Sequence, residues 1–285
     1  MTATTDSAEA RPRERVLGRP EQVLSYVHFR AQVREVRRLT PNMARVTLGG
    51  PDLAGLTSAG KDQRIKLFFP LAGQREPVLT SGPSWYQDYL AQPVDVRPVM
   101  RTYTLRGHRP EHNEVDVDFV LHGDTGPASA WVARAQRGDH VGLLAPNALH
   151  APILGYEYHP APGTDWHLLA GDETALPAIG GIVESLPAGA VAKVFVEVPE
   201  DADRQDFHTA ADVEITWLAH HHGESRLLDA IRRADLPSGQ AYAWIAGECT
   251  VIKHVRRHLL RERGVAKDAL YFSGYWRRGA DHDSL

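Results

Sequence analysis

The stretch from Trp166 to Leu186, WHLLAGDETALPAIGGIVESL, contains the clearest change of pattern in the sequence. Its first five residues are mostly apolar, which is typical of a strand buried on both faces, and a turn follows at Gly171. After the turn, apolar residues return at helical spacing, and these are Ala175, Ile179, Ile182, Val183 and Leu186. A buried strand, a glycine turn and a helix in this order predict a unit of a parallel α/β sheet.

The alternation of strand and helix continues towards the end of the chain. Apolar runs rich in β-branched residues predict further strands, and segments with apolar residues on one helical face predict further helices. The expected strands are 191–198, 213–219, 242–246 and 270–273, and the expected helices are 226–234 and 251–264. This pattern favours a parallel sheet that is covered by helices on both faces.

The chain before Trp166 has a different pattern. Short alternating or β-branched runs are separated by turn residues such as Thr40-Pro41-Asn42, which is typical of a closed antiparallel barrel. The expected strands are 27–36, 43–48, 65–69, 101–105, 115–121 and 141–144. One helix is expected from Ala128 to Ala135, because proline at position 127 suits the first turn of a helix.

Two domains are expected from a length of 285 residues. Residues 1–22 have no apolar periodicity and are expected to form a flexible tail. The first domain is placed at residues 23–157 and the second at residues 164–285. A proline-rich bridge, YHPAPG at residues 158–163, separates them.

Composition excludes several classes of protein. The net charge of −4 gives no global attraction to nucleic acid, and no apolar run approaches the length of a membrane span. Cys249 is the only cysteine, so an internal disulfide is excluded and cytoplasmic residence is expected. Adjacent side chains of an extended segment diverge, so His220-His221-His222 is interpreted as a solvated loop and no metal site is expected.

The segment RTYT, Arg101 to Thr104, is the first with chemical information. In a strand, Arg101 and Tyr103 project from one face and Thr104 from the other. A guanidinium beside an aromatic ring can hold phosphate oxygens while the ring packs on a flat ligand. The alternative is an ordinary exposed strand face.

Two further segments precede expected helices. In HGDTGPASAW, residues 122–131, glycines come before a helix start whose free amides could receive a pyrophosphate; a plain loop and helix cap is the alternative. In AGDETALPAI, residues 170–179, the GxGxxG fingerprint is absent and Asp172-Glu173 would repel a phosphate. Here a helix cap by Asp172 or Thr174 is the alternative.

Taken in order, five segments resemble the siderophore-interacting protein family, a branch of the ferredoxin-reductase-like flavoproteins. They are RTYT at 101–104, GPAS at 126–129, AGDETALPAI at 170–179, AGE at 246–248 and GYWR at 274–277. The similarity spans roughly Tyr26 to Gly279. It implies a six-stranded antiparallel Greek-key β-barrel that binds FAD, followed by a parallel-sheet α/β domain that receives NADPH or NADH.

The resemblance also implies which residues meet the cofactors. Arg101 would hold phosphate, Tyr103 would stack on the flavin, and Thr104 would lie near the ring edge. The other implied FAD-binding positions are Thr102, Asp118, Phe119, Val120, His122, Thr125, Gly126, Ala128, Ser129 and Trp131. On the nicotinamide side it implies Asp172, Glu173, Thr174 and Ala175, with Trp276 near the flavin ring.

Ferric siderophores are the substrate that the resemblance implies. Ferric iron is a hard cation held by oxygen-rich chelators, and an added electron weakens its bonds to them. A flavin can accept two electrons from NAD(P)H and return them singly, so no acid or base catalyst is expected. Lys66 and Arg277 match positions where the family has basic residues facing the substrate. The alternative is that both are ordinary exposed cations.

The sequence leaves the electron donor and the acceptor open. Glu197 would favour the ribose of NADH, whereas Arg204 would favour a 2′-phosphate, and a ferredoxin is a further donor. A monomer is expected. The rival functions are a flavin or other-acceptor reductase of the same fold and a siderophore-binding protein without redox activity.

Overall fold

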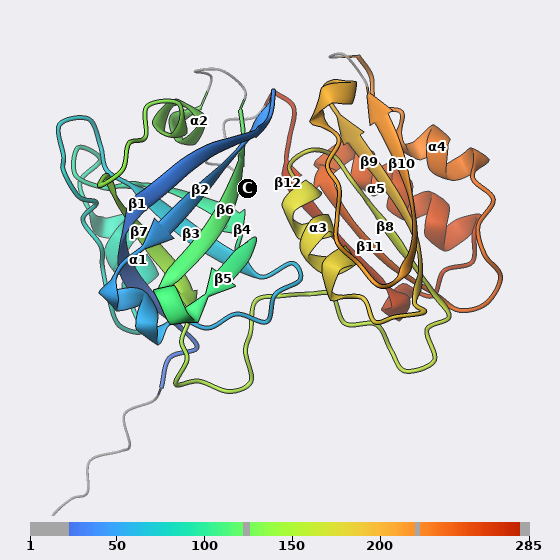
Figure 1. The fold of residues 1–285 in the computed structure, drawn as a ribbon, viewed down its shortest axis with the longest axis horizontal. Coiled ribbons are helices and arrows are strands. Elements are labelled where there is room, and N and C mark those ends of the chain that lie inside the picture. Colours follow the sequence, from blue (N-terminus) through green and yellow to red (C-terminus); the bar gives the residue numbers. More distant parts are fainter. Residues whose placement is uncertain (1–22, 122–125, 220–222, 280–285) are drawn as a thin grey trace, which may run out of the picture.

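Two β-sheets, one antiparallel and one parallel, organise the computed structural model, which describes residues 23–121, 126–219 and 223–279. Figure 1 shows the two sheets side by side, with the antiparallel sheet formed by the N-terminal half of the chain. We call the antiparallel sheet with α1 and α2 the antiparallel lobe, and the parallel sheet with α3, α4 and α5 the parallel lobe. The expected tail, residues 1–22, lies outside the described residues.

Seven strands form the antiparallel sheet, in the order β4-β3-β7-β1-β2-β6-β5. The prediction of six strands was therefore wrong. The additional strand is β5, which has three residues and pairs with β6. The elements of this lobe are β1 (Tyr26–Thr40), β2 (Met43–Gly49), β3 (Arg64–Phe69), α1 (Trp85–Ala91), β4 (Val99–Thr104), β5 (Gly107–Arg109), β6 (Glu114–Val120), α2 (Pro127–Val132) and β7 (His140–Pro146).

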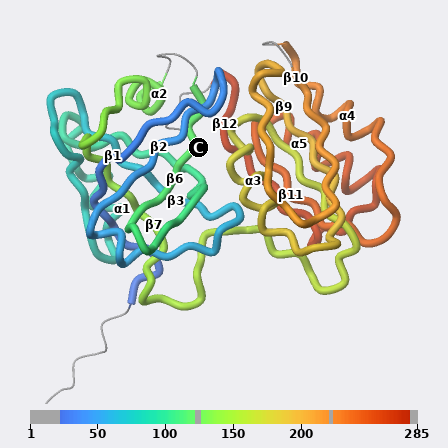
Figure 2. Tube along the Cα trace, in the orientation of Figure 1, coloured from blue at the N-terminus to red at the C-terminus, as the bar shows by residue number. Residues whose placement is uncertain are grey.

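The curvature of this sheet encloses one apolar core (Figure 2). In β2 and β6, alternate residues such as Val46, Leu48, Val115 and Val117 are fully buried in the core. Their neighbours along the strands, including Asp116, project from the opposite face. The alternation thus leaves polar side chains on the outer face of the sheet.

Five parallel strands form the second sheet, in the order β10-β9-β8-β11-β12, as expected. Leu169 packs with α3 and Leu168 packs with α4 and α5, so successive residues of one strand enter opposite cores. The elements are β8 (Trp166–Gly171), α3 (Leu176–Ser185), β9 (Val191–Val198), β10 (Asp212–Ala219), α4 (Leu227–Arg233), β11 (Ala241–Glu248), α5 (Cys249–Arg261) and β12 (Leu270–Trp276). No helix in the described part of the chain is long and apolar enough to cross a membrane.

Polar contacts fix the two lobes against each other. Asp203, which is 3% exposed, accepts hydrogen bonds from the Thr40 hydroxyl at 2.7 Å and from the Asn42 backbone amide at 2.9 Å. On another side, Arg106 forms a two-point ion pair with Glu184 of α3, at 2.8 and 2.6 Å. A buried acid and a bidentate pair restrict relative motion of the lobes.

The face of α3 that meets the antiparallel lobe carries a glycine where the backbones approach closely. A Cβ at Gly181 would collide with the carbonyl oxygen of Lys61, so only glycine fits there without movement. Next to this contact, Asp62 accepts a hydrogen bond from the Trp244 indole at 2.9 Å. The middle of α3 and the strand β11 are therefore anchored to the loop before β3.

Candidate functional site

Arg101 and Tyr103 lie on the same face of β4, opposite Leu67 and Ile65 of β3. Both side chains are half-buried. Burial raises the pKa of the Tyr103 phenol, and the Arg101 guanidinium is close enough to lower that pKa in part. A cation and an aromatic ring therefore stand together on this strand.

An aromatic cluster surrounds the Tyr103 ring. The ring centroid lies 4.5 Å from that of Phe119 and 6.5 Å from that of Phe69. Trp131 of α2 joins the cluster at 4.9 Å from Phe69 and 6.1 Å from Phe119. Three of the predicted residues therefore meet although they come from different elements, and these are Tyr103 of β4, Phe119 of β6 and Trp131 of α2. Phe69 was not among the predicted residues, although its neighbour Phe68 makes a double aromatic at the end of β3 visible in the sequence.

The start of α2 lies beside this cluster. Gly126 has extended backbone and Pro127 opens the helix, and the glycine at the N-cap position has no side chain with which to cap the first amide groups. Ala128 and Ser129 are buried there. The helix has only six residues, so its contribution to binding an anion comes from directed N–H groups more than from a dipole. His122 and Thr125, predicted for the same loop, lie outside the described residues.

Three predicted cofactor residues have their side chains elsewhere. Asp118 is buried on the outer face of β6, where it accepts hydrogen bonds from Arg45 at 2.7 and 2.9 Å. Val120 packs against the core of the parallel lobe. Thr102 accepts a hydrogen bond from the Lys66 ammonium at 3.2 Å, on the face of β4 opposite to Tyr103.

Lys66 and Arg277, the two predicted substrate contacts, differ in their surroundings. Burial, with the nearby Arg64 as the second cause, lowers the pKa of the Lys66 ammonium. Arg277 follows β12 and is exposed. Of the two predicted substrate contacts, Lys66 is therefore half-buried and Arg277 is exposed.

Thr104, which was predicted to lie near the edge of the flavin ring, is 7% exposed at the end of β4.

Asp172 connects the carboxyl ends of three parallel strands. Its carboxylate accepts hydrogen bonds from the Glu248 backbone amide and the Trp276 indole, both at 2.8 Å. It also accepts from the Thr174 amide at 3.0 Å and the Thr174 hydroxyl at 2.5 Å. Trp276 is therefore held in a fixed direction at the end of β12. α3 itself begins after Ala175 without a side-chain cap, and Asp172 instead accepts the Thr174 amide in the turn before the helix.

Glu173 follows in the same turn and is 8% exposed. Burial, together with the neighbouring carboxylates of Asp172, Glu197 and Asp203, raises the pKa of Glu173 to about 8. This carboxyl is therefore largely neutral near pH 7, and the repulsion of a phosphate expected from an Asp-Glu pair is reduced.

Glu197 at the end of β9 is engaged within the chain. Its carboxylate accepts hydrogen bonds from the Ser225 hydroxyl at 2.7 Å and from the Arg226 backbone amide. Each oxygen thus accepts one hydrogen bond from the segment before α4, and the residue is only 4% exposed, so the carboxylate is held within the chain. Arg204 is paired with Asp201 on the surface. The predicted loop His220-His221-His222 lies outside the described residues.

Family models match both lobes. Residues 32–150 match a siderophore-interacting FAD-binding domain, and residues 164–279 match a siderophore-interacting protein model. The chain belongs to the siderophore-interacting protein family. Among relatives of this family, ferric vibriobactin reductase ViuB of Vibrio cholerae is 35% identical over 250 residues, which is 86% of this chain and 88% of ViuB.

Other members and solved structures agree with the family assignment. The NADPH-dependent ferric-chelate reductase of Escherichia coli is 31% identical over 252 residues, covering 86% of this chain and 91% of that protein. A siderophore utilization protein from T. fusca superimposes with a TM-score of 0.77 at 34% identity, covering 92% and 98% of the two chains. A ferredoxin reductase of carbazole 1,9a-dioxygenase, with a TM-score of 0.62 at 15% identity, shares the fold.

The residues at the aromatic cluster fit the FAD that this family binds. Arg101 supplies a guanidinium suited to phosphate, and the start of α2 supplies backbone amide groups. Tyr103, a half-buried residue, supplies an aromatic ring for a planar partner. Phosphate donors and a flat aromatic surface within one cluster are the two features that FAD requires.

Proposed function

We propose that this protein reduces ferric siderophores with electrons from NADPH or NADH through bound FAD, releasing Fe(II) for iron assimilation. The observation that carries the proposal is the placement of Arg101 beside Tyr103 at the aromatic cluster of a chain similar over most of its length to ferric-chelate reductases. Each NAD(P)H supplies two electrons, so two ferric ions are reduced and one proton is released.

The two lobes would divide the task. We assign FAD binding to residues 23–157 and NAD(P)H binding to residues 164–285, whose segment after β12 would lie on the flavin side. The fixed contact between Thr40 and Asp203 would keep both sites in one orientation during turnover.

Bound FAD supplies the conversion of a two-electron donor into single-electron transfers. The residues of the chain would bind the FAD and orient it. Arg101 would hold the phosphates, with the amides of Ala128 and Ser129 as further donors, and the Tyr103 ring would support the flat flavin. Asp172 would hold the Trp276 indole at the opposite lobe, so that the carboxyl end of β12 excludes water from the space between donor and acceptor.

Lys66 and Arg277 are proposed to attract anionic ferric siderophores, because local cations raise encounter rates even on a chain with a net charge of −4. We also propose cytoplasmic residence and a monomeric state. A ferredoxin is the alternative electron donor and would be supported if neither NADPH nor NADH bleaches the flavin.

Anaerobic mixing tests both half-reactions. FAD-loaded protein mixed with NADPH or NADH should lose its visible flavin absorbance, and ferric catecholate or hydroxamate chelates should then restore it while a ferrous-specific dye reports Fe(II). Reoxidation by free flavins or quinones in preference to ferric chelates would favour an other-acceptor reductase. Protein that gains no flavin spectrum when given FAD would indicate a siderophore carrier.

Replacing Arg101 with alanine should weaken FAD binding by about ten-fold, because a charge-assisted contact to phosphate is lost. Titration of apoprotein with FAD, followed by visible absorbance, measures the effect. Arg101→Lys should recover only part of the affinity, since it keeps the charge but not the planar fork. Arg75→Ala, at an exposed arginine in the loop after β3, is the control. Equal FAD affinity of R101A and R75A would contradict the assignment of Arg101.

A further inference from the structure

A second concave site lies on the outer face of the antiparallel sheet, away from the aromatic cluster. It is a hollow of about 470 Å³ lined by five arginines, Arg34, Arg37, Arg45, Arg109 and Arg137, together with three acidic side chains and Thr47. Asp116 of β6 projects into this outer face, whereas its neighbours Val115 and Val117 are buried in the core. We call it the arginine hollow.

The charges of the hollow are not balanced within the chain. Arg109 is paired with Asp116 at 2.6 Å and with Glu114 at 3.3 Å, and Arg45 is paired with Asp118. In the described segments, no carboxylate lies within ion-pair distance of the other three arginines, which are Arg34, Arg37 and Arg137. The hollow is therefore positive on a chain that is negative overall.

The strand register places like charges opposite each other. Arg37 of β1 is the direct cross-strand partner of Arg45 of β2. Two cations in this relation repel each other and destabilise the sheet. Asp118 offsets only Arg45, so the charge of Arg37 is left for a ligand.

A β-bulge in β1 positions Arg34, a further cation of the arginine hollow. The register of β1 against β2 shifts between Val33 and Glu35, which leaves Arg34 as the extra residue. Its side chain lies across Gly49, and a Cβ at Gly49 would come within 2.8 Å of the Arg34 Nε. Glycine thus leaves room for this arginine to lie along the sheet. Arg137, from the loop before β7, donates to the Arg34 carbonyl at 3.5 Å.

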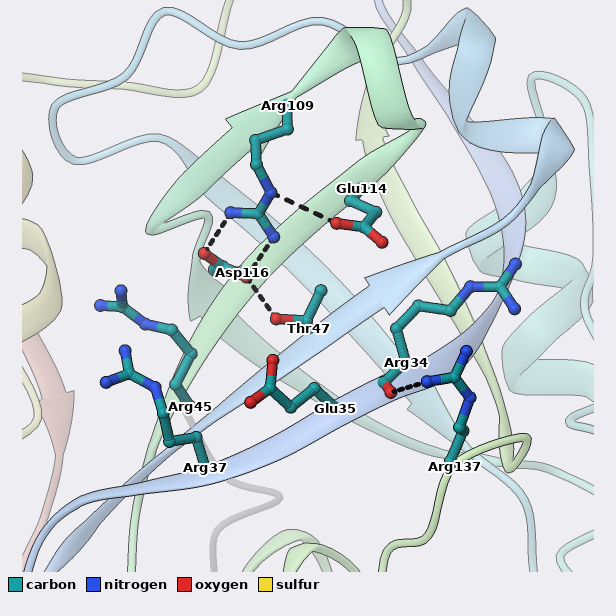
Figure 3. Close-up of a pocket in the computed structure, with 9 residues that line it drawn as sticks. All are labelled: Arg34, Glu35, Arg37, Arg45, Thr47, Arg109, Glu114, Asp116 and Arg137. Carbon is teal, nitrogen blue, oxygen red and sulfur yellow. Dashed lines mark hydrogen bonds and ion pairs between the residues drawn. The ribbon is translucent and has the colours of Figure 1, made fainter.

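Figure 3 shows how the side chains divide the arginine hollow. Arg37 and Arg45 lie side by side at one end, and Arg34 and Arg137 lie at the other. Glu35, which has no ion-pair partner in the part of the chain described, lies between the two ends with Thr47. A ligand suited to this order carries an anion at each end and hydroxyl groups in the middle.

We propose that the arginine hollow binds a sugar bisphosphate or a closely similar small molecule with two phosphates on a hydroxyl-bearing chain. Arg37 at one end, and Arg34 with Arg137 at the other, have no carboxylate within ion-pair distance in the described segments, and such guanidiniums match a phosphate dianion better than a carboxylate. Hydroxyl groups in the middle can donate to the Glu35 carboxylate, whereas a continuous polyphosphate would meet its negative charge. The site is independent of the reductase function.

Calorimetric titration of FAD-loaded protein with fructose 1,6-bisphosphate tests the proposal. We expect one molecule to bind per chain, with affinity that falls as salt rises. Fructose 6-phosphate, which has one phosphate, should bind about ten-fold more weakly, since one charge-assisted contact is lost. Tartrate, which places hydroxyls between two carboxylates, should also bind more weakly, and equal affinity for tartrate would overturn the assignment to phosphate.

Variants at the two ends complete the test. Arg37→Gln and Arg34→Gln should each weaken bisphosphate binding by about ten-fold, towards the affinity of the monophosphate. Arg233→Gln, on the exposed side of α4, makes the same charge change and should leave binding unaltered. All three variants should keep the visible flavin spectrum, which shows that they are folded. The proposal is overturned if wild type does not bind, or if the two end variants bind as tightly as Arg233→Gln.

Discussion

Replacing Asp172 with alanine is expected to lower the free energy of unfolding of the parallel lobe by about 3 to 5 kcal/mol. The carboxylate is 7% exposed and accepts four hydrogen bonds, from Thr174, Glu248 and Trp276. Alanine would leave these donors without a partner at the point where β8, β11 and β12 end. Unpaired buried donors cost more than the hydrogen bonds themselves contribute.

Urea unfolding followed by circular dichroism measures this loss. Asp172→Asn should be intermediate, because its amide can accept from one side of the turn but presents a donor to the other. Asp201→Ala is the matched control, since Asp201 has a side chain that is 65% exposed and is paired with Arg204 on the surface. A midpoint for D172A equal to that of D201A would show that Asp172 is not the connection between these strands.

The order of strands and helices could be predicted because most elements bury a regular apolar pattern. Trp166 to Gly171 is buried throughout, and the helix expected at 175–186 is found at Leu176–Ser185. The two elements that the sequence did not predict, β5 and α1, bury no such regular apolar pattern. β5 has three half-buried residues, and α1 has no buried residue at all. β5 is too short to show a periodicity. In α1, Trp85, Tyr86, Tyr89 and Leu90 fall at helical spacing, but the helix has only seven residues and none of them is buried.

The site could be predicted only where one strand carries it. Alternation along β4 is enough to place Arg101 and Tyr103 on one face. The contact of Tyr103 with Phe119 and Phe69 depends on how β3, β4 and β6 lie in the curved sheet, which no local pattern encodes.

The acids at the carboxyl ends of the parallel strands illustrate the same limit. Parallel strands end at the same side of a sheet, so the strand order predicts that one edge of the parallel sheet carries Asp172, Glu197 and Glu248. Their hydrogen bonds do not follow from it. Glu248 accepts the amides of Thr250 and Val251, so its carboxylate caps the start of α5.

Stability should depend strongly on pH through Glu173. Burial and three neighbouring carboxylates raise its pKa to about 8 in the folded protein, from 4.5 in a free chain. Between these values the folded protein keeps a proton that the unfolded chain has lost, so the free energy of unfolding falls as pH rises. Below the lower value both states are protonated and the penalty is absent, and above the higher value the penalty is complete.

Glu173→Gln removes this titration and keeps the shape of the side chain. The variant should match wild type near pH 4.5, the free-chain value, and exceed it in stability by on the order of 5 kcal/mol above about pH 8. Urea unfolding of both FAD-loaded proteins across this range measures the difference. Glu224→Gln, at an exposed acid before α4, should retain the wild-type profile. A gap between E173Q and wild type that stays constant with pH would mean that Glu173 is ionised in the folded protein, and the acidic edge would then repel an incoming phosphate.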